Sequence, residues 1–216
     1  SVVAIGSSFD KKTVLNEESE YKIGRLNLGY FETKKKAEEL VVQAYKDNKL
    51  QPIIVNPTTV YGPGDSKKGS RKTQLKVAKG KFPFYSSGGV NVVSIHEVIE
   101  ASYKAFMGAA NPGERHILAG ENITIKQLFD LIAKHAEVKP PHIYLPNPIL
   151  HAIGKAGDAL EAIGKSGPLN SENAWTATMY HWFDSTKAQK KLGLNVVSAD
   201  ECIKQSVDWM IDNNYL

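Results

Sequence analysis

A tyrosine and a lysine four residues apart, Tyr30 and Lys34, have the types and spacing of an acid-base pair. Residues at this spacing share one face of a helix, so the ammonium group can lie close to the phenol. A free phenol has a pKa near 10, and a neighbouring positive charge lowers that pKa by stabilising the phenolate. A tyrosine in such a position can exchange a proton at neutral pH.

The same spacing occurs at Tyr45 and Lys49, and with 27 basic residues among 216 the spacing alone carries little weight. Tyr30 stands at the start of a predicted helix, where the positive end of the helix dipole also favours a phenolate. Tyr45 lies at the end of that helix, on its apolar stripe. We therefore interpret Tyr30 and Lys34 as the reactive pair. Tyr45 is predicted to be a packing residue, with Lys49 solvated.

The apolar pattern indicates which elements position this pair. A helix is predicted from after Leu28 to about Asp47, with one apolar face at Ala37, Leu40, Val41, Ala44 and Tyr45. Residues 52–56 form a short apolar strand of the kind that is buried in parallel sheets. Residues 1–6 are interpreted as the tail of another buried strand, with further sequence expected upstream. This order of strand, helix and strand indicates a βαβ unit.

Strands and helices continue to alternate up to about residue 136. Further strands are predicted at 90–95 and 115–119, and each precedes a helix, at 96–107 and 124–136. From Pro140 onward helical patterns dominate, at 150–163 and 171–182. Two helix boundaries carry local signals: Asp184 as a cap and Gly193 as a stop, then Ser198 with Glu201 as a capping box.

These elements predict an α/β fold, the C-terminal part of a doubly wound, Rossmann-type parallel sheet with a smaller, mainly helical substrate lobe. The predicted division assigns residues 1–65 and 90–112 to the remainder of a dinucleotide-binding domain. Residues 66–89 and 113–216 are assigned to the substrate-binding lobe.

Composition narrows the classes of protein that fit. Hydrophobic residues at 42% and charged residues at 23% are typical of an ordinary globular protein. A net charge of only +4 is weak support for a nucleic-acid partner, so none is expected. The single cysteine, Cys202, cannot form an internal disulfide, and no apolar run approaches the length of a membrane span. We expect a cytoplasmic protein with a small-molecule substrate and no membrane partner, and we leave a homodimer open.

Several blocks of the sequence resemble the extended short-chain dehydrogenases/reductases, the NAD-dependent epimerase/dehydratase family. In chain order the blocks are Ser1-Val-Val-Ala-Ile-Gly6, Tyr30-Phe-Glu-Thr-Lys34 with Ala37-Glu38, Asn56-Pro-Thr-Thr-Val-Tyr-Gly-Pro-Gly-Asp65, the strand ending at Ser94, Gly113-Glu-Arg-His-Ile-Leu-Ala-Gly120, and Asp184-Ser-Thr-Lys-Ala188 with Leu192-Gly193. The resemblance covers nearly the whole chain. It is greatest to dihydroflavonol-4-reductase-like proteins and to hopanoid-associated sugar epimerases.

The resemblance implies NAD or NADP as cofactor and a triad of serine, tyrosine and lysine. By position, Ser1 would hydrogen-bond the substrate oxygen and Tyr30 would exchange its proton. Lys34 would hold the nicotinamide ribose and tune Tyr30. The structural alternative for Ser1 is a serine that merely ends a strand.

Further positions follow from the same resemblance. The residues expected to line the nicotinamide end are Asn56, Pro57 and Thr59, and the candidates for substrate contact are Tyr61, Ser94 and His96. Relatives often carry His and Asp where this chain has Ser94 and His96. The step from Asn56 to Pro57 could also be simple turn chemistry, and His96 could be only a helix-start residue.

The chain departs from the family at the phosphate-binding turn. The family binds the dinucleotide pyrophosphate with a glycine-rich turn after the first strand, and this sequence contains none. The segment Gly62-Pro63-Gly64 cannot replace it, because proline has no N–H to donate. The chain alone is therefore expected to be inactive. No metal site is predicted, since no pair of cysteines exists and the histidines are scattered.

The resemblance implies a reductase of ketones or aldehydes in which Tyr30 is the general acid and the cofactor supplies the hydride. An epimerase or dehydratase of nucleotide sugars would use the same triad, and the motifs do not separate the two reactions. A third alternative is a truncated protein of the same fold that binds a ligand without turnover.

Overall fold

The computed structural model describes residues 1–64, 72–167 and 169–216, so Asp65 at the end of one predicted motif lies outside it. The helices are α1 (Gly29–Lys46), α2 (Lys72–Ala78), α3 (Ile95–Lys104), α4 (Ile125–His135), α5 (Asn147–Ala162), α6 (Ser171–Thr176), α7 (Thr186–Leu192) and α8 (Ala199–Asp212). The strands are β1 (Ile54–Pro57), β2 (Thr59–Tyr61), β3 (Phe84–Tyr85), β4 (Gly89–Ser94), β5 (Arg115–Leu118), β6 (Glu121–Thr124) and β7 (Ile143–Tyr144).

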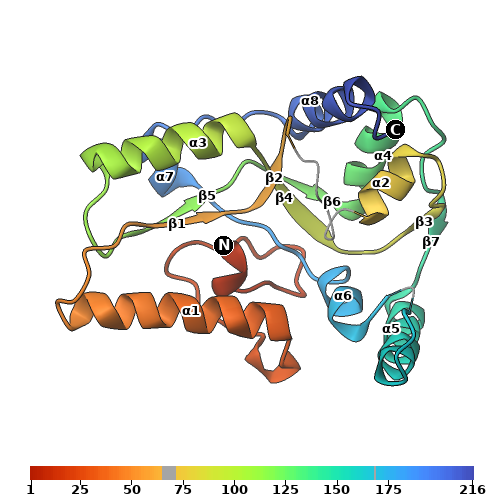
Figure 1. Ribbon diagram of the computed structural model, residues 1–216, viewed down its shortest axis with the longest axis horizontal. Coiled ribbons are helices and arrows are strands. Elements are labelled where there is room, and N and C mark those ends of the chain that lie inside the picture. The colour runs from red at the N-terminus through yellow and green to blue at the C-terminus, as the bar shows by residue number, and fades with distance from the viewer. Residues whose placement is uncertain (65–71, 168) are drawn as a thin grey trace.

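The strand pairs that position the candidate site are parallel. Strand β1 pairs with β5, with Asn56 opposite Ile117, and β2 pairs with β4. Helices α3 and α7 lie on one side of β1 and β5, and α1 lies on the other (Figure 1). Helices on both faces of parallel strands confirm the predicted doubly wound α/β class. Strand β6, which was not predicted, pairs antiparallel with β4.

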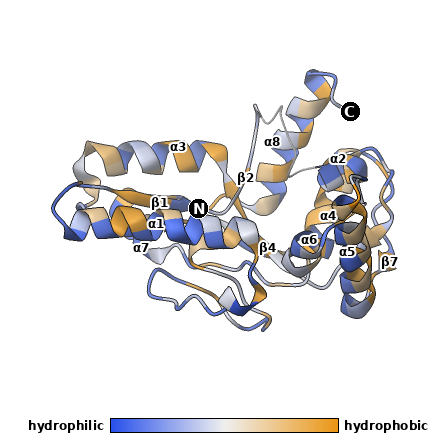
Figure 2. Ribbon diagram, turned by 60° about the horizontal axis from the view of Figure 1, so that its bottom comes forward, coloured by the Kyte–Doolittle hydropathy of each residue, from blue (hydrophilic) through white to orange (hydrophobic). Residues whose placement is uncertain are grey.

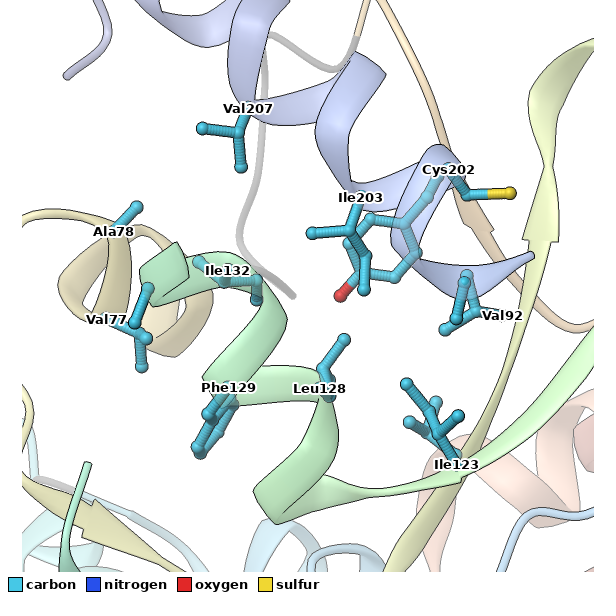
Figure 3. Packing of buried hydrophobic residues seen from close by; sticks show 14 residues of the cluster. Val77, Ala78, Val92, Ile123, Leu128, Phe129, Ile132, Cys202, Ile203 and Val207 are labelled. Atoms are coloured by element: carbon cyan, nitrogen blue, oxygen red, sulfur yellow. The ribbon is translucent and has the colours of Figure 1, made fainter. Parts of the chain in front are cut away.

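The largest core cluster joins three helices to the end of this sheet. Side chains of α4 and α8 pack against β4 and β6, with α2 at the far side, as Figure 3 shows for Leu128, Ile203, Val92, Ile123 and Val77. Each such side chain contributes roughly 1.5–3 kcal/mol when it is fully buried. This cluster fixes the helices around the end of β4, on the side of the sheet away from α1 (Figure 1).

The opening residues correct one prediction, because Val2–Ala4 form a short 3-10 helix and not the tail of a strand. The N–H of Ala4 donates to the carbonyl of Ser1 at 3.1 Å, so the chain turns directly after Ser1. Val2 and Ile5 are nevertheless buried against Ile117. A short apolar run indicates that the residues are buried, but it does not distinguish a strand from a turn of helix.

Helix α1 has the predicted bounds, but its predicted apolar face is only partly buried. Leu40 on the expected apolar stripe is 64% exposed, and Phe31 is the one fully buried residue of the helix. Figure 2 shows both hydrophilic and hydrophobic residues along α1. Phe31 packs with Ile23, Leu28 and Met179. Among the described residues, α1 is therefore anchored in a hydrophobic core at its N-terminal end, through Phe31.

The boundaries of the later helices follow their local signals. Ser198 accepts a hydrogen bond from the N–H of Glu201, and Gly193 ends α7 in the left-handed conformation with φ 61°. Asp184 accepts the N–H of Thr186 at 2.6 Å, but the N-cap position of α7 is occupied by Ser185 and not by Asp184 as predicted. Helix α6 is shorter than predicted because the chain beyond it pairs with the N-terminal segment. There the backbones of Tyr180 and Ser8 exchange two hydrogen bonds.

Strand β5, which the predicted division assigns to the substrate lobe, pairs with β1 of the predicted dinucleotide-binding part. The division between the two parts itself stays a prediction. Among the described residues, no helix is both long enough and apolar enough to span a membrane.

Candidate active site

Tyr30 and Lys34 lie on the solvent side of the first turns of α1. Tyr30 is the second residue of the helix and is 53% exposed, so its phenol is not part of a packed interior. The Lys34 Nζ atom lies 5.8 Å from the centroid of the Tyr30 ring. Phe31 lies edge-on to Tyr30, with ring centroids 6.3 Å apart, and is buried. A phenol and an ammonium group therefore share one exposed face, as the spacing predicted.

Helix α1 receives its N-terminal cap from a distant segment. Leu28 in the N-cap position offers no side-chain hydrogen bond. The carboxylate of Glu172, on α6, instead accepts the N–H of Tyr30 at 2.8 Å. The first N–H groups of a helix have no partner within the helix, and a carboxylate there also interacts well with the helix dipole. Sequence reasoning missed Glu172, because 142 positions separate it from Tyr30.

Ser1 is tied to the sheet through Asn56. The side-chain Nδ2 of Asn56 donates to the carbonyl oxygen of Ser1 at 3.0 Å and to Glu38 Oε2 at 2.6 Å. Asn56 lies on β1 and is fully buried. One amide group thus joins the turn after Ser1, the strand and the helix that carries Tyr30 and Lys34.

Glu38 is the second anchor of this arrangement. Its carboxylate pairs with the Arg115 guanidinium at 2.5 Å, and the Glu38 side chain is only 10% exposed. Because Glu38 follows Lys34 by four residues, the helix presents both side chains along one face. The same spacing that identified Tyr30 and Lys34 could therefore have indicated Glu38. Sequence reasoning did not find it.

The structure brings the elements of Ser1, Tyr30 and Lys34 together without direct polar contacts. The 3-10 helix after Ser1 packs against α1. In the described part of the chain, no hydrogen bond joins the hydroxyls of Ser1 and Tyr30 to each other or to Lys34. The roles of these three residues in a reaction stay predictions.

The residues expected at the nicotinamide end occupy the end of β1 and the start of β2. Pro57 ends β1 and Thr59 begins β2. Within residues 1–64, 72–167 and 169–216, the buried Oδ1 of Asn56 has no hydrogen-bond donor. The contacts of Asn56, Pro57 and Thr59 with a cofactor stay predictions.

The three candidates for substrate contact do not form one group. Tyr61 and Ser94 are opposite each other on β2 and β4, and both are buried, at 2% and 4% exposure. Tyr61 belongs to the largest core cluster. His96 lies in the first turn of α3 and is exposed. Contact of any of the three with a substrate stays a prediction.

Tyr45 is a packing residue, as predicted. Its ring lies against Gly113, where an added Cβ would come within 2.3 Å of Tyr45 Cε1. Lys49 is 71% exposed and pairs with Asp47 at 3.1 Å. The geometry therefore favours Tyr30 over Tyr45 as the reactive tyrosine.

A cavity of about 330 Å³ is lined by Glu38, Arg115, Tyr21 and Lys35 among others, but not by Tyr30 or Lys34. The hydroxyl of Tyr21 donates to Glu32 at 2.8 Å. Burial and then this hydrogen bond raise the pKa of Tyr21. Tyr21 is therefore a poor acid-base candidate at neutral pH.

A second polar network, also missed from the sequence, stiffens the sheet beside the site. The side chain of Asn91 accepts from the Thr58 hydroxyl at 2.7 Å and from the Gly120 N–H at 2.9 Å. It donates to the Gly120 carbonyl at 3.0 Å and to Asn122 at 2.8 Å. Asn91 therefore fixes the turn between β1 and β2 relative to β4 and β6.

Known proteins resemble this chain over most of its length. A family model for NAD-binding proteins, described as "Male sterility protein", matches residues 3–102. A Synechocystis sp. protein named "Putative dihydroflavonol 4-reductase" is 24% identical over 224 residues, covering 100% of this chain and 64% of that protein. The chain thus spans just under two thirds of that relative.

Two solved structures share the fold. The protein in the crystal structure of gox2253 is 27% identical, with a TM-score of 0.83, over 100% of this chain and 66% of that one. A nucleoside-diphosphate-sugar epimerase from Pseudomonas aeruginosa is 20% identical, with a TM-score of 0.75, over 99% of this chain and 65% of that one. At 20% identity the second likeness supports the fold alone.

Proposed function

Because the chain belongs to the extended short-chain dehydrogenase/reductase family, we propose that the protein is an NAD(P)-dependent oxidoreductase that reduces a ketone or an aldehyde. The observation that carries the proposal is the exposed Tyr30 phenol beside Lys34 at the start of α1. The turn after Ser1 is held to the same helix through Asn56 and Glu38. This arrangement supports proton transfer at an oxygen bound between α1 and Ser1.

The residues present suit the nicotinamide end of such a cofactor. Tyr30 and Lys34 are open to solvent, and the Asn56 Oδ1 atom is a buried acceptor without a donor among the described residues. Lys34 would hold the ribose, while Asn56, Pro57 and Thr59 would line the ring. The reduced cofactor, when bound, supplies a hydride to the carbonyl carbon.

The residues of this chain would transfer the proton to the carbonyl oxygen. Tyr30 gives its phenolic proton to the carbonyl oxygen, so the carbonyl becomes an alcohol and the tyrosine becomes a phenolate. The Lys34 ammonium stabilises that phenolate until a solvent proton replaces the one lost. The Ser1 hydroxyl donates a hydrogen bond to the same oxygen and holds it near Tyr30.

The test compares two tyrosine variants of the complete protein. NADH and NADPH consumption is followed with a panel of ketones and aldehydes, for the wild type, Tyr30→Phe and Tyr45→Phe. We expect Tyr30→Phe to lose at least about a hundredfold in kcat, the usual contribution of a general acid. Tyr45→Phe should keep its activity, because that ring packs on Gly113. Full turnover in Tyr30→Phe would contradict the proposal.

Epimerisation of a nucleotide sugar is the second candidate, because the same phenol could remove a hydroxyl proton and later return it. The sequence motifs leave this reaction open, because the same serine, tyrosine and lysine would serve both reactions. Incubation of the complete protein with UDP-sugars separates the two reactions. A reductase consumes one NAD(P)H for each product, whereas an epimerase converts the sugar with no net change in cofactor.

A further inference from the structure

We propose that Glu172 is a positioning residue for Tyr30. Through Glu172, helix α6 would determine the position of the reactive phenol. This inference rests on the proposed function of Tyr30. The contact that carries it is the 2.8 Å hydrogen bond from the Tyr30 N–H to Glu172 Oε1, across 142 positions of sequence.

The Glu172 carboxylate lies over the first turn of α1. A Cβ added to Gly29 would be 3.8 Å from Glu172 Oε2, so the carboxylate spans Gly29 and Tyr30. The other acid of this turn, Glu32, accepts the Tyr21 hydroxyl. The side chain of Leu28 in the N-cap position makes no capping hydrogen bond. The cap of α1 at Tyr30 is therefore supplied from α6.

The position of the Tyr30 ring depends on the start of α1. Its ring neighbours, Phe31 and Lys34, belong to the same helix, and the ring is 53% exposed. A shift of the first turn therefore moves the phenol relative to Ser1, whose carbonyl oxygen is bonded to Asn56 on β1. Misplacement of a reacting group by about 1 Å can cost as much as a hundredfold in rate.

Helix α6 is a rigid support for Glu172 because it packs closely on α5. A Cβ on Gly154 would lie 2.9 Å from Ala174 Cβ, and one on Gly157 would lie 1.8 Å from the Leu169 carbonyl oxygen. Asp158 on α5 also accepts the Ser171 N–H at 2.9 Å. The two helices therefore carry Glu172 together, and a displacement of the pair is transmitted to Tyr30.

The test uses the complete protein and measures kcat, KM and amide exchange in residues 28–33. Glu172→Ala removes the acceptor, Glu172→Gln keeps an acceptor oxygen, and Glu161→Ala removes an exposed carboxylate on the neighbouring helix α5. We expect Glu172→Ala to lower kcat about tenfold, with little change in KM and with faster exchange at the start of α1. Glu172→Gln and Glu161→Ala should stay close to the wild type.

Two results would overturn the inference. In one, Glu172→Ala keeps the wild-type kcat even though exchange at the start of α1 is faster, so the cap is only structural. In the other, Glu172→Gln loses as much as Glu172→Ala, so the hydrogen bond is not the cause. Tyr30→Phe in the same series separates this failure from that of the proposed function. If Tyr30→Phe turns over normally, Tyr30 is not the acid and the proposed function falls as well.

Discussion

The Ser7 hydroxyl and His181 Nδ1 lie 2.6 Å apart, and His181 Nε2 lies 3.0 Å from the Thr176 carbonyl oxygen. A neutral imidazole with its proton on Nε2 satisfies both contacts, since Nδ1 then accepts from Ser7. This ring joins the segment after Ser1 to the chain that follows α6. Burial lowers the pKa of His181.

The lowered pKa predicts a loss of stability in mild acid. The unfolded chain, with a histidine pKa of 6.5, binds a proton that the folded protein excludes as the pH falls below that value. The free energy of unfolding should therefore decrease below about pH 6.5, by at most about 1.4 kcal/mol per pH unit for one proton. Urea unfolding of the complete protein between pH 5 and 8 measures this slope.

His181→Gln should reduce that slope, although His116 and His151, whose pKa values are also lowered by burial, leave a remainder. His96→Gln is the matched control, because His96 is exposed on α3. An unchanged slope in His181→Gln, equal to that of the control, would show that His181 does not exclude the proton.

Gly113 should be intolerant of a side chain. It has φ 82° and touches the Tyr45 ring, whereas Gly164 has φ 74° with open space around it. Both alanine variants lose the same backbone freedom, so their difference isolates the overlap with Tyr45. We expect Gly113→Ala to lose about 2 kcal/mol more than Gly164→Ala in urea unfolding, as overpacking usually does. Equal losses would mean that Tyr45 moves aside freely.

Asn91 should contribute strongly to stability. Removal of its side chain takes away the partner of both the N–H and the carbonyl of Gly120, whereas the Thr58 hydroxyl keeps the Leu118 carbonyl and Asn122 keeps the backbone of Phe183. Unsatisfied buried polar groups cost roughly 1–3 kcal/mol each, so Asn91→Ala should lower the free energy of unfolding by about 3 kcal/mol. Asn195→Ala, at an exposed position, should change it little. A small loss in Asn91→Ala would indicate that water replaces the amide.

Cys202 should react only when the protein unfolds. It is fully buried in the cluster of Figure 3, and burial raises the pKa of its thiol to about 11. The thiolate is the reactive species, so alkylation at pH 8 should be slow in the native protein and should rise with the unfolded fraction in urea. Peptide mapping by mass spectrometry follows this residue specifically. Rapid labelling without denaturant would contradict the packing.

Features with local causes were predictable from the sequence. Helix α1, strand β1 and the boundaries at Gly193 and Ser198 follow from apolar spacing and from caps within a few residues. The pairing of Tyr30 with Lys34 is also local, because one helical turn separates them. The packing of Tyr45 was predictable from its place at the helix end.

Features with distant causes were not predictable in this way. Strand β6 is polar and short, and pairing with β4 makes it a strand. Leu40 is 64% exposed although it lies on the apolar stripe of α1, so an apolar position does not reveal whether a neighbour covers it. Glu172 caps α1 through a contact that no spacing rule contains. The candidate site is therefore predictable in its residues, but not in the contacts that hold them.

The bonds of Glu38 fix the rotational phase of α1. Asn56 and Arg115 both hold this carboxylate, so the helix cannot turn about its axis without breaking the ion pair between Glu38 and Arg115. Each residue of an α-helix advances by about 100°. One residue inserted between Lys34 and Glu38 would therefore swing the phenol about a quarter of the way around the helix, away from Ser1.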